Sequence, residues 1–509
     1  MTSSGDRHLR PEPSGRLKSL HASPRDVGIS IDRESAGTFA GQVVVAMLVN
    51  LLARQFGVVD RIVLDIPHAH PDFRAFPSMV NSRATLREQL IEFGRAVAGE
   101  EMRVEGGAVD PDLAVQIQIG PGLAPTPTEG LSLVVFGDGW EAFCSSIESS
   151  PERSARSLVP FGPMLAACLA AGRAFRHLWG ADADGTSSAD LWSFMPAAWS
   201  LERAPELQNV ELPDTHVIGL GAVGAAFCFA LACAPDLRGN LVGLDPQDTD
   251  VTSRNRLLSA LYVDVRASKA KLADRLFQSH SIEFFPNSLP WPAYALDPKR
   301  NAPAAVKAEE DNFRYRWVVS CVDDNIHRQN IANYLPKHLL GGSTKGLVAQ
   351  ATYYSILGPC ECLTCNHPVI GFNADALIQE LRDMTPEGRS AVYDQRGLSQ
   401  HDRAAIDEYL EDPECDVVGA AELRRMGVEG AAEWSVGFVS AAAGVMLAAY
   451  YLRCVMEGAI AVVGAAAERR LIFLGAQELI RSGAVRKADC ELCSSQATKE
   501  HFAALWSGA

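Results

Sequence analysis

Three glycines in the second half of the chain have a spacing that suits nucleotide chemistry, G-x-G-x-x-G. They are Gly219, Gly221 and Gly224. An apolar strand expected at 215–220 precedes them and a helix expected at 225–233 follows. Glycines let such a turn tighten and approach a phosphate, which the N–H groups at the helix N-terminus then bind. Asp245 ends the next expected strand, where its carboxylate can accept from ribose hydroxyls. The pattern predicts a nucleotide site; a dinucleotide oxidoreductase and an empty tight turn are the alternatives.

Charged and polar residues beyond this turn favour phosphoryl chemistry over hydride transfer. They are Asn255, Arg256, Lys269, Asp323, Asp324 and Arg328. Arginine and lysine can neutralise a triphosphate and its transition state, and an aspartate can hold Mg2+ through oxygen. Each charge taken singly fits a solvated surface. Together, and in this order, they predict an ATP and Mg2+ site.

Two C-x-x-C pairs can supply four thiolates to one metal ion. They are Cys362 with Cys365 and Cys490 with Cys493. Four thiolates are the ligand set of a closed, structural Zn2+ site, if the fold brings the distant pairs together. A redox C-x-x-C is the alternative, and Cys360 is a possible substitute ligand.

Alternating helices and apolar strands must position these residues, which predicts an α/β fold with mainly parallel sheets. We expect a disordered leader over 1–27, a first domain over 28–200, a linker over 201–213 and a second domain over 214–509. The first domain lacks a glycine-rich turn before its first helix, so nucleotide binding is not expected there.

Composition limits the classes of binding partner and the cellular compartment that we expect. The 509 residues carry a formal net charge of -16, which argues against a general nucleic-acid binder or an anionic-membrane binder. The chain shows neither a secretory signal nor a run of about 20 apolar residues, so we expect a cytoplasmic protein without a membrane span. The apolar segment 436–451 is expected to be a buried helix. In a reducing compartment, the twelve cysteines favour metal binding or catalysis over disulfides.

With these motifs in order, residues 214–500 resemble the ubiquitin-activating-enzyme superfamily, which includes the bacterial ThiF and MoeB adenylyltransferases. That pattern is a glycine loop, an Asp ending the second strand, S-N-x-N-R, a Lys 13 residues later and D-N-x-x-x-R. Asp245 matches the ribose carboxylate, Arg256 and Lys269 match the phosphate-binding pair, and Asn255 matches the preceding Asn. Asp323 matches the magnesium ligand, since it lies five residues before Arg328.

Two positions depart from the superfamily pattern. Asp324 stands where the family has Asn, so either aspartate could be the magnesium ligand. Thr252 and Ser253 replace the Ser-Asn step, which leaves the contacts of that step open. The superfamily also has C-x-x-C pairs at corresponding places, which supports structural zinc.

The resemblance implies ATP-dependent adenylation of the C-terminus of a ubiquitin-like protein. It also implies a crossover loop and catalytic-cysteine segment, here 366–433. Cys415, in a polar, proline-bearing stretch that suggests exposure, is the candidate thioester cysteine, which would pass the acyl group to a conjugating enzyme. The acidic neighbours Glu414 and Asp416 would by themselves raise the pKa of the thiol.

The whole chain is most similar to the BilD-type activating enzymes of bacterial ubiquitination-like operons. This implies two Rossmann-like adenylation folds, inactive then active, with a small helical catalytic-cysteine insertion, in an antiphage system. Arg33 is a candidate for an arginine that reaches ATP from the inactive half. The alternatives are a sulfur-carrier adenylyltransferase of the ThiF and MoeB type and a non-enzymatic scaffold that binds a ubiquitin-like partner.

Overall fold

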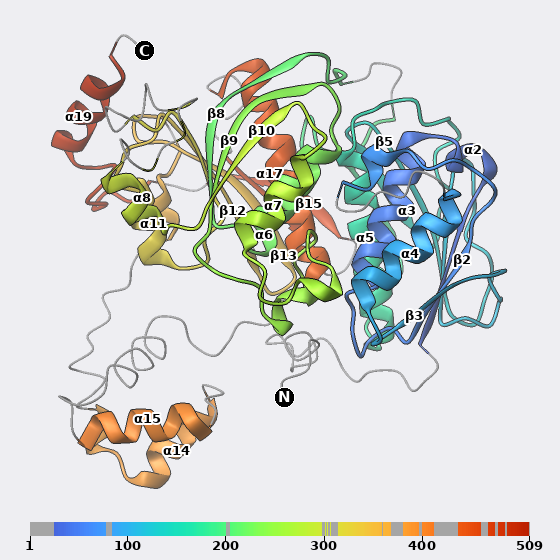
Figure 1. The fold of residues 1–509 in the computed structure, drawn as a ribbon, viewed down its shortest axis with the longest axis horizontal. Coiled ribbons are helices and arrows are strands. Elements are labelled where there is room, and N and C mark those ends of the chain that lie inside the picture. Colours follow the sequence, from blue (N-terminus) through green and yellow to red (C-terminus); the bar gives the residue numbers. More distant parts are fainter. Residues whose placement is uncertain are drawn as a thin grey trace.

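The structure is a computed structural model with two α/β halves side by side, the first blue to teal and the second green to red in Figure 1. It describes residues 25–77, 84–199, 204–297, 301, 303, 306, 314–358, 360–367, 380–395, 400–411, 436–459, 467–473, 477–483 and 486–507.

The first half is a seven-stranded sheet in the order β3-β2-β1-β4-β5-β6-β7. Its elements are β1 (Asp26–Ile31), α2 (Arg33–Ala36), α3 (Phe39–Leu52), β2 (Arg61–Asp65), η1 (Phe73–Ala75), α4 (Leu86–Ala98), β3 (Arg103–Gly106), β4 (Val115–Ile119), β5 (Leu131–Asp138), β6 (Glu141–Ser145), α5 (Phe161–Leu178) and β7 (Thr186–Asp190). The first five strands in this order, from β3 through β1 to β5, pair in parallel with their neighbours. The last two, β6 and β7, pair antiparallel. The strand β1 begins at Asp26, two residues before the start that the sequence predicted for the first domain.

The second half is an eight-stranded sheet in the order β10-β9-β8-β11-β12-β13-β14-β15. Its elements are β8 (Val210–Ile218), α6 (Ala222–Cys233), β9 (Leu237–Leu244), η2 (Val251–Asn255), η3 (Tyr262–Asp264), α7 (Lys269–Phe277), β10 (Ile282–Asn287), α8 (Trp291–Leu296), β11 (Trp317–Ser320), α11 (Asn325–Ala332), β12 (His338–Lys345), β13 (Val348–Tyr354), α12 (Leu363–Asn366), α17 (Gly437–Glu457), β14 (Glu468–Ile472), β15 (Glu478–Ser482) and α19 (Gln496–Trp506). Since β8 already begins at Val210, the last four residues of the expected linker are strand.

The two sheets repeat one topology. In each, the third, second, first, fourth and fifth strands pair in parallel, and the next two continue antiparallel. The helix α3 follows β1 as α6 follows β8, and α5 precedes β7 as α17 precedes β14. The chain is therefore an α/β protein with two parallel-rich sheets of the same strand order.

Two long helices, α5 and α17, pack against each other and join the halves. The ring of Phe175 on α5 lies 5.4 Å from that of Phe438 on α17. On its other side α17 approaches α6 so closely that a Cβ at Gly444 would lie 2.5 Å from the Cβ of Ala226. By length and composition alone α17 could span a membrane, yet 89% of its apolar window is buried inside the protein. The apolar segment 436–451 is thus a core helix, as expected.

A small helical unit lies between β13 and α17 in the sequence. It contains α14 (Pro386–Gln395) and α15 (Gln400–Glu411), and its own core is formed by Leu381, Tyr393, Ile406 and Leu410. The hydroxyl of Tyr393 donates to Asp407 at 2.7 Å, which ties the two helices together.

Candidate functional site

The glycine turn lies where the parallel strands β8 and β11 end side by side. Gly219 has φ +87°, which a residue with a side chain rarely adopts. A Cβ at Gly224 would lie 1.9 Å from the carbonyl oxygen of Gly219, whereas a Cβ at Gly221 would meet nothing within 4 Å. The first and third glycines therefore allow the tight turn and close packing, and the second faces open space. The strand order reverses at this point of the sheet, which is where α/β sheets bind ligands.

Asp245 connects the glycine turn to the start of α7. Its carboxylate accepts hydrogen bonds from the backbone N–H of Leu220 at 2.8 Å and of Gln247 at 2.9 Å. Burial raises the pKa of Asp245, the Lys269 ammonium opposes this shift, and the Asp323 carboxylate adds to it. The ammonium of Lys269 donates to the Oε1 of Gln247 at 2.6 Å. The structure thus brings Asp245, Lys269 and Asp323 together beside the turn.

Asn255 and Arg256 end the 3-10 helix η2. Asp250 caps this helix by accepting from the backbone N–H and hydroxyl of Ser253, at 2.6 and 2.8 Å. The Asn255 side chain is buried, and the Arg256 guanidinium donates to the Thr252 carbonyl at 2.7 Å and to Asn255 Oδ1 at 3.0 Å. Of the residues that replace the Ser-Asn step, Ser253 therefore pairs with the cap Asp250, and Thr252 anchors Arg256 through its carbonyl.

The two candidate magnesium ligands have different surroundings. Asp324 is the N-cap of α11, and its Oδ1 accepts from the backbone N–H of His327 at 2.9 Å. Asp323 is exposed and lies close enough to Asp245 to affect its pKa. An exposed carboxylate fits an oxygen-preferring Mg2+ better than one engaged in a helix cap. The donor set therefore favours Asp323.

Arg328 extends the site toward α12. Its Nη1 donates to Asn325 Oδ1 at 2.8 Å and lies 3.2 Å from Nδ1 of His367. Burial, and then the charge of Arg328, lower the pKa of His367 to about 3, so this ring is neutral and can accept from Arg328. His367 lies two residues after the Cys362–Cys365 pair, and that motif gives no sign of a contact with Arg328 in the sequence.

Four cysteines form a buried cluster between α12 and the segment before α19. The Sγ atoms of Cys362, Cys365, Cys490 and Cys493 lie within 4.8 Å of one another. The two closest cross-pair distances are 3.6 and 3.4 Å. Tetrahedral Zn–S bonds of about 2.3 Å place sulfurs roughly 3.8 Å apart, so the cluster fits zinc. Cys360 is buried but is not part of this four-sulfur group.

Two other predicted residues lie elsewhere. Cys415 falls outside the described residues, between the end of α15 and the start of α17. Arg33 is exposed on α2, which packs against α3 of its own half. The structure thus leaves the role expected for each of them as a prediction.

The first half places a carboxylate where the second half has its glycine turn. Asp32 follows β1 as Gly219 follows β8, and its two oxygens accept from the backbone N–H and the hydroxyl of Ser35, at 2.9 and 2.8 Å. A Cβ at Gly120, which follows β4, would lie 1.7 Å from Asp32 Oδ2. An acidic side chain thus fills the end of these strands, which disfavours a phosphate there.

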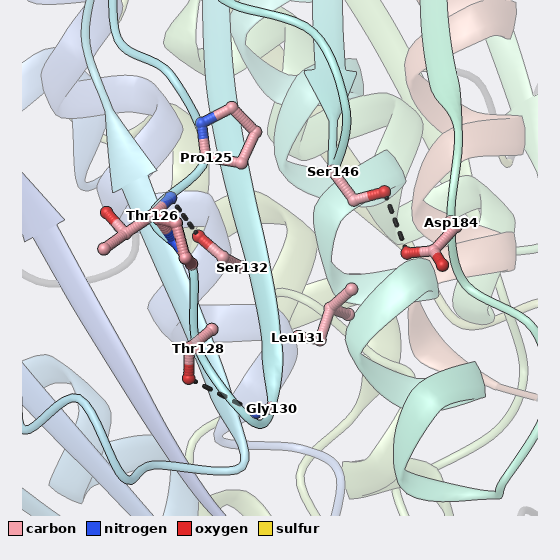
Figure 2. Close-up of a pocket in the computed structure, with 9 residues that line it drawn as sticks. Pro125, Thr126, Thr128, Gly130, Leu131, Ser132, Ser146 and Asp184 are labelled. Atoms are coloured by element: carbon pink, nitrogen blue, oxygen red, sulfur yellow. Dashed lines mark hydrogen bonds between the residues drawn. The ribbon is translucent and has the colours of Figure 1, made fainter.

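A polar pocket opens elsewhere in the first half, between the start of β5 and the segment before β7 (Figure 2). Its polar groups bond to one another: Ser132 accepts from the N–H of Thr126 at 2.9 Å, and Ser146 donates to Asp184 at 3.1 Å. None of the predicted site residues lines it.

Comparisons with known proteins match parts of the chain. It is 27% identical over 270 residues to the Uncharacterized protein y4jF of Sinorhizobium fredii (strain NBRC 101917 / NGR234), covering 52% of this chain and 48% of that protein. The match spans about half the length of that relative. Among solved structures, E. coli MccB with MccA-N7isoASN is 14% identical with a TM-score of 0.35, over 57% of this chain and 68% of that one. The Microcin C7 biosynthetic enzyme MccB with N-formylated MccA is 15% identical with a TM-score of 0.35, over 56% and 68%. At these values no activity is transferred from MccB. Residues 26–194, the first half, match the family model described as the BilD N-terminal domain.

Proposed function

We propose that this protein uses ATP to adenylate the C-terminus of a ubiquitin-like protein and then carries it as a thioester for a conjugating enzyme. The observation that carries the proposal is the grouping of Asp245, Lys269 and Asp323 beside an open glycine turn at the end of parallel strands. Open space at the second glycine, the backbone N–H groups at the start of α6, a cation and an exposed carboxylate suit a nucleoside triphosphate with its metal ion. The BilD N-terminal match of the first half supports a bacterial ubiquitination-like setting, which we propose to be antiphage.

In the first step, an oxygen of the partner's C-terminal carboxylate attacks the α-phosphorus of ATP. A bond forms between this oxygen and phosphorus, and the bond from the α-phosphorus to the bridging oxygen breaks to release pyrophosphate. Lys269 and Arg256 neutralise the charge that develops on the phosphate oxygens. Asp245 orients the ribose, and Asp323 would hold Mg2+, which supplies further charge neutralisation.

In the second step, the Cys415 thiolate attacks the acyl carbonyl of the adenylate. A carbon–sulfur bond forms, and the bond from the acyl carbon to the phosphate oxygen breaks, so that AMP leaves with that oxygen; the proton of the thiol has passed to solvent when the thiolate formed. The small unit of α14 and α15 ends four residues before this cysteine, so it would carry the nucleophile. The four buried thiols would hold a structural zinc ion, with no coordination position left for chemistry.

The test combines the protein with ATP, Mg2+ and ubiquitin-like proteins encoded beside it. We expect pyrophosphate exchange and a thiol-sensitive adduct. Cys415→Ala keeps the exchange but loses the adduct, whereas the matched control Cys144→Ala, buried in the first half, keeps both. An adduct that survives Cys415→Ala refutes the role of this cysteine. Exchange without any adduct in the unmodified protein supports the sulfur-carrier alternative, and ATP binding without exchange indicates a scaffold.

A further inference from the structure

The segment that carries Asn255 and Arg256 is held by a buried arginine from the other half of the chain. Arg54, two residues beyond the end of α3, is 1% exposed. Its guanidinium donates to the carbonyls of Arg254 at 2.7 Å, Leu258 at 3.1 Å and Ala260 at 2.6 Å. Asn50 on α3 orients it by accepting from its Nε at 2.8 Å.

A second set of contacts from the first half holds the same segment. The guanidinium of Arg254 pairs with Glu101 at 2.5 Å and lies over the rings of Phe56 and Tyr262, 5.5 and 4.4 Å from their centroids. Gly99, at the end of α4, lies so close to the Tyr262 ring that a Cβ there would be 2.1 Å from it. The contact between the first half and this segment therefore needs both a charge pair and a residue without a side chain.

The segment has little regular structure of its own. Residues 251–264 contain two short 3-10 helices, η2 and η3, joined by irregular backbone, and such helices are weakly stabilised by their internal hydrogen bonds. The start of α17 also packs closely against the segment, since a Cβ at Gly437 would lie 2.7 Å from the carbonyl oxygen of Asn255. The backbone of Asn255 and Arg256 is thus fixed from outside the segment.

We propose that Arg54 is a positioning residue for the ATP-binding arginine Arg256, so that the first half orders one wall of the nucleotide site in the second half. This inference rests on the proposed function, because it assigns Arg256 to the phosphates. Arg54 acts through the carbonyls on either side of Asn255 and Arg256, and it touches no reacting atom. Its five-donor fork can satisfy several carbonyls at once, which a lysine ammonium on a flexible stem does not reproduce.

The experiment compares Arg54→Met with Arg173→Met in the full-length protein. Arg173 on α5 is equally buried and donates to the Ala183 carbonyl at 2.5 Å and to the Ser187 hydroxyl at 2.9 Å, away from the segment 251–264. Both variants lose a buried guanidinium and leave acceptors unpaired, so both should lower the melting temperature. Steady-state pyrophosphate exchange gives KM for ATP and for the ubiquitin-like partner. Amide hydrogen exchange follows residues 251–264 without requiring activity.

We expect Arg54→Met to raise KM for ATP about ten- to a hundredfold, the effect of misplacing one charge-assisted hydrogen bond, with KM for the partner within about twofold. Amide hydrogen exchange over 251–264 should rise in Arg54→Met and stay unchanged in Arg173→Met. If both variants change KM for ATP equally, the effect is general destabilisation and the proposal is overturned. An Arg54→Met variant that folds and shows unchanged KM for ATP and unchanged amide hydrogen exchange over 251–264 overturns the proposal as well.

A milder variant keeps the test decisive if Arg54→Met does not fold. Glu101→Gln conserves side-chain volume at a partly exposed position and removes only the charge pair with Arg254. It should raise both KM for ATP and hydrogen exchange over 251–264, by a smaller factor than Arg54→Met, and an unchanged result counts against the proposal. If the unmodified protein shows no exchange of pyrophosphate, the proposed function fails, while selective loosening of 251–264 would still establish the contact between the halves.

Discussion

Replacing Gly221 by alanine adds a methyl group where the structure leaves open space. The backbone at Gly221 has φ -67° and ψ -158°, which alanine adopts without strain. Restricting the unfolded chain stabilises a Gly→Ala variant by about 0.4–1 kcal/mol. Alanine is a poorer helix N-cap than glycine, at a cost of roughly 0.5–1 kcal/mol. Because the two terms oppose each other, the free energy of unfolding should change by less than about 1 kcal/mol.

ATP binding should respond quite differently to this substitution. The new methyl group would occupy space against which a phosphate lies, and would push it away from the N–H groups at the start of α6. Losing one hydrogen bond to a charged group costs about 1.5–3 kcal/mol, which corresponds to a roughly ten- to a hundredfold higher Kd. Titration calorimetry with ATP and chemical denaturation of the same sample measure the two quantities.

Gly224 is the matched control on the same turn. A Cβ there would collide with the carbonyl oxygen of Gly219, so Gly224→Ala should lower the free energy of unfolding by about 1–3 kcal/mol. Gly221→Ala that binds ATP as tightly as the unmodified protein would refute phosphate binding at this turn. Gly224→Ala with unchanged stability would refute the packing argument.

Two further predictions concern the metal ions. Removing zinc with a chelator, or substituting Cys490→Ser, should lower the melting temperature and release zinc, at one ion per chain by atomic absorption, because the cluster joins α12 to the C-terminal segment. Asp323→Ala should weaken Mg2+-dependent pyrophosphate exchange at least tenfold with little change in stability. Asp324→Ala should instead cost about 0.5–2 kcal/mol of stability through the lost cap of α11, measured by denaturant unfolding.

Much of the second half could be predicted because its signals are local in the sequence. The spacing of Gly219, Gly221 and Gly224 directly predicts the turn. In the structure, the surroundings of the three glycines differ. The two C-x-x-C pairs likewise predicted a cluster, although their distance in the sequence left its formation to the fold. Strands such as β3 and β7 could not be predicted in this way, because they are short and polar and lack the apolar alternation by which a strand is recognised.

Contacts between residues far apart in the chain could not be predicted from the sequence alone. Arg54 reads as a charged residue after an apolar helix, and nothing near it indicates carbonyl partners some 200 residues away. The sequence indicates only an ordinary helix cap at Asp32. That it holds the position equivalent to Gly219 is apparent only when the two sheets are compared. The sequence also left Asp323 and Asp324 equivalent, and only the backbone of α11 shows that Asp324 is engaged as a helix cap.

The repeated strand order within one chain has a consequence for stoichiometry. In a symmetric pair of identical subunits, every residue serves in both copies, so a position cannot be a glycine in one site and an aspartate in the other. Here the equivalent positions hold Gly219 and Asp32, so the two halves differ in the side chain that they place at the end of this strand. Because both halves belong to one polypeptide, their contact persists at any dilution, and the part of the chain that the structure describes places one glycine turn of this kind in each molecule.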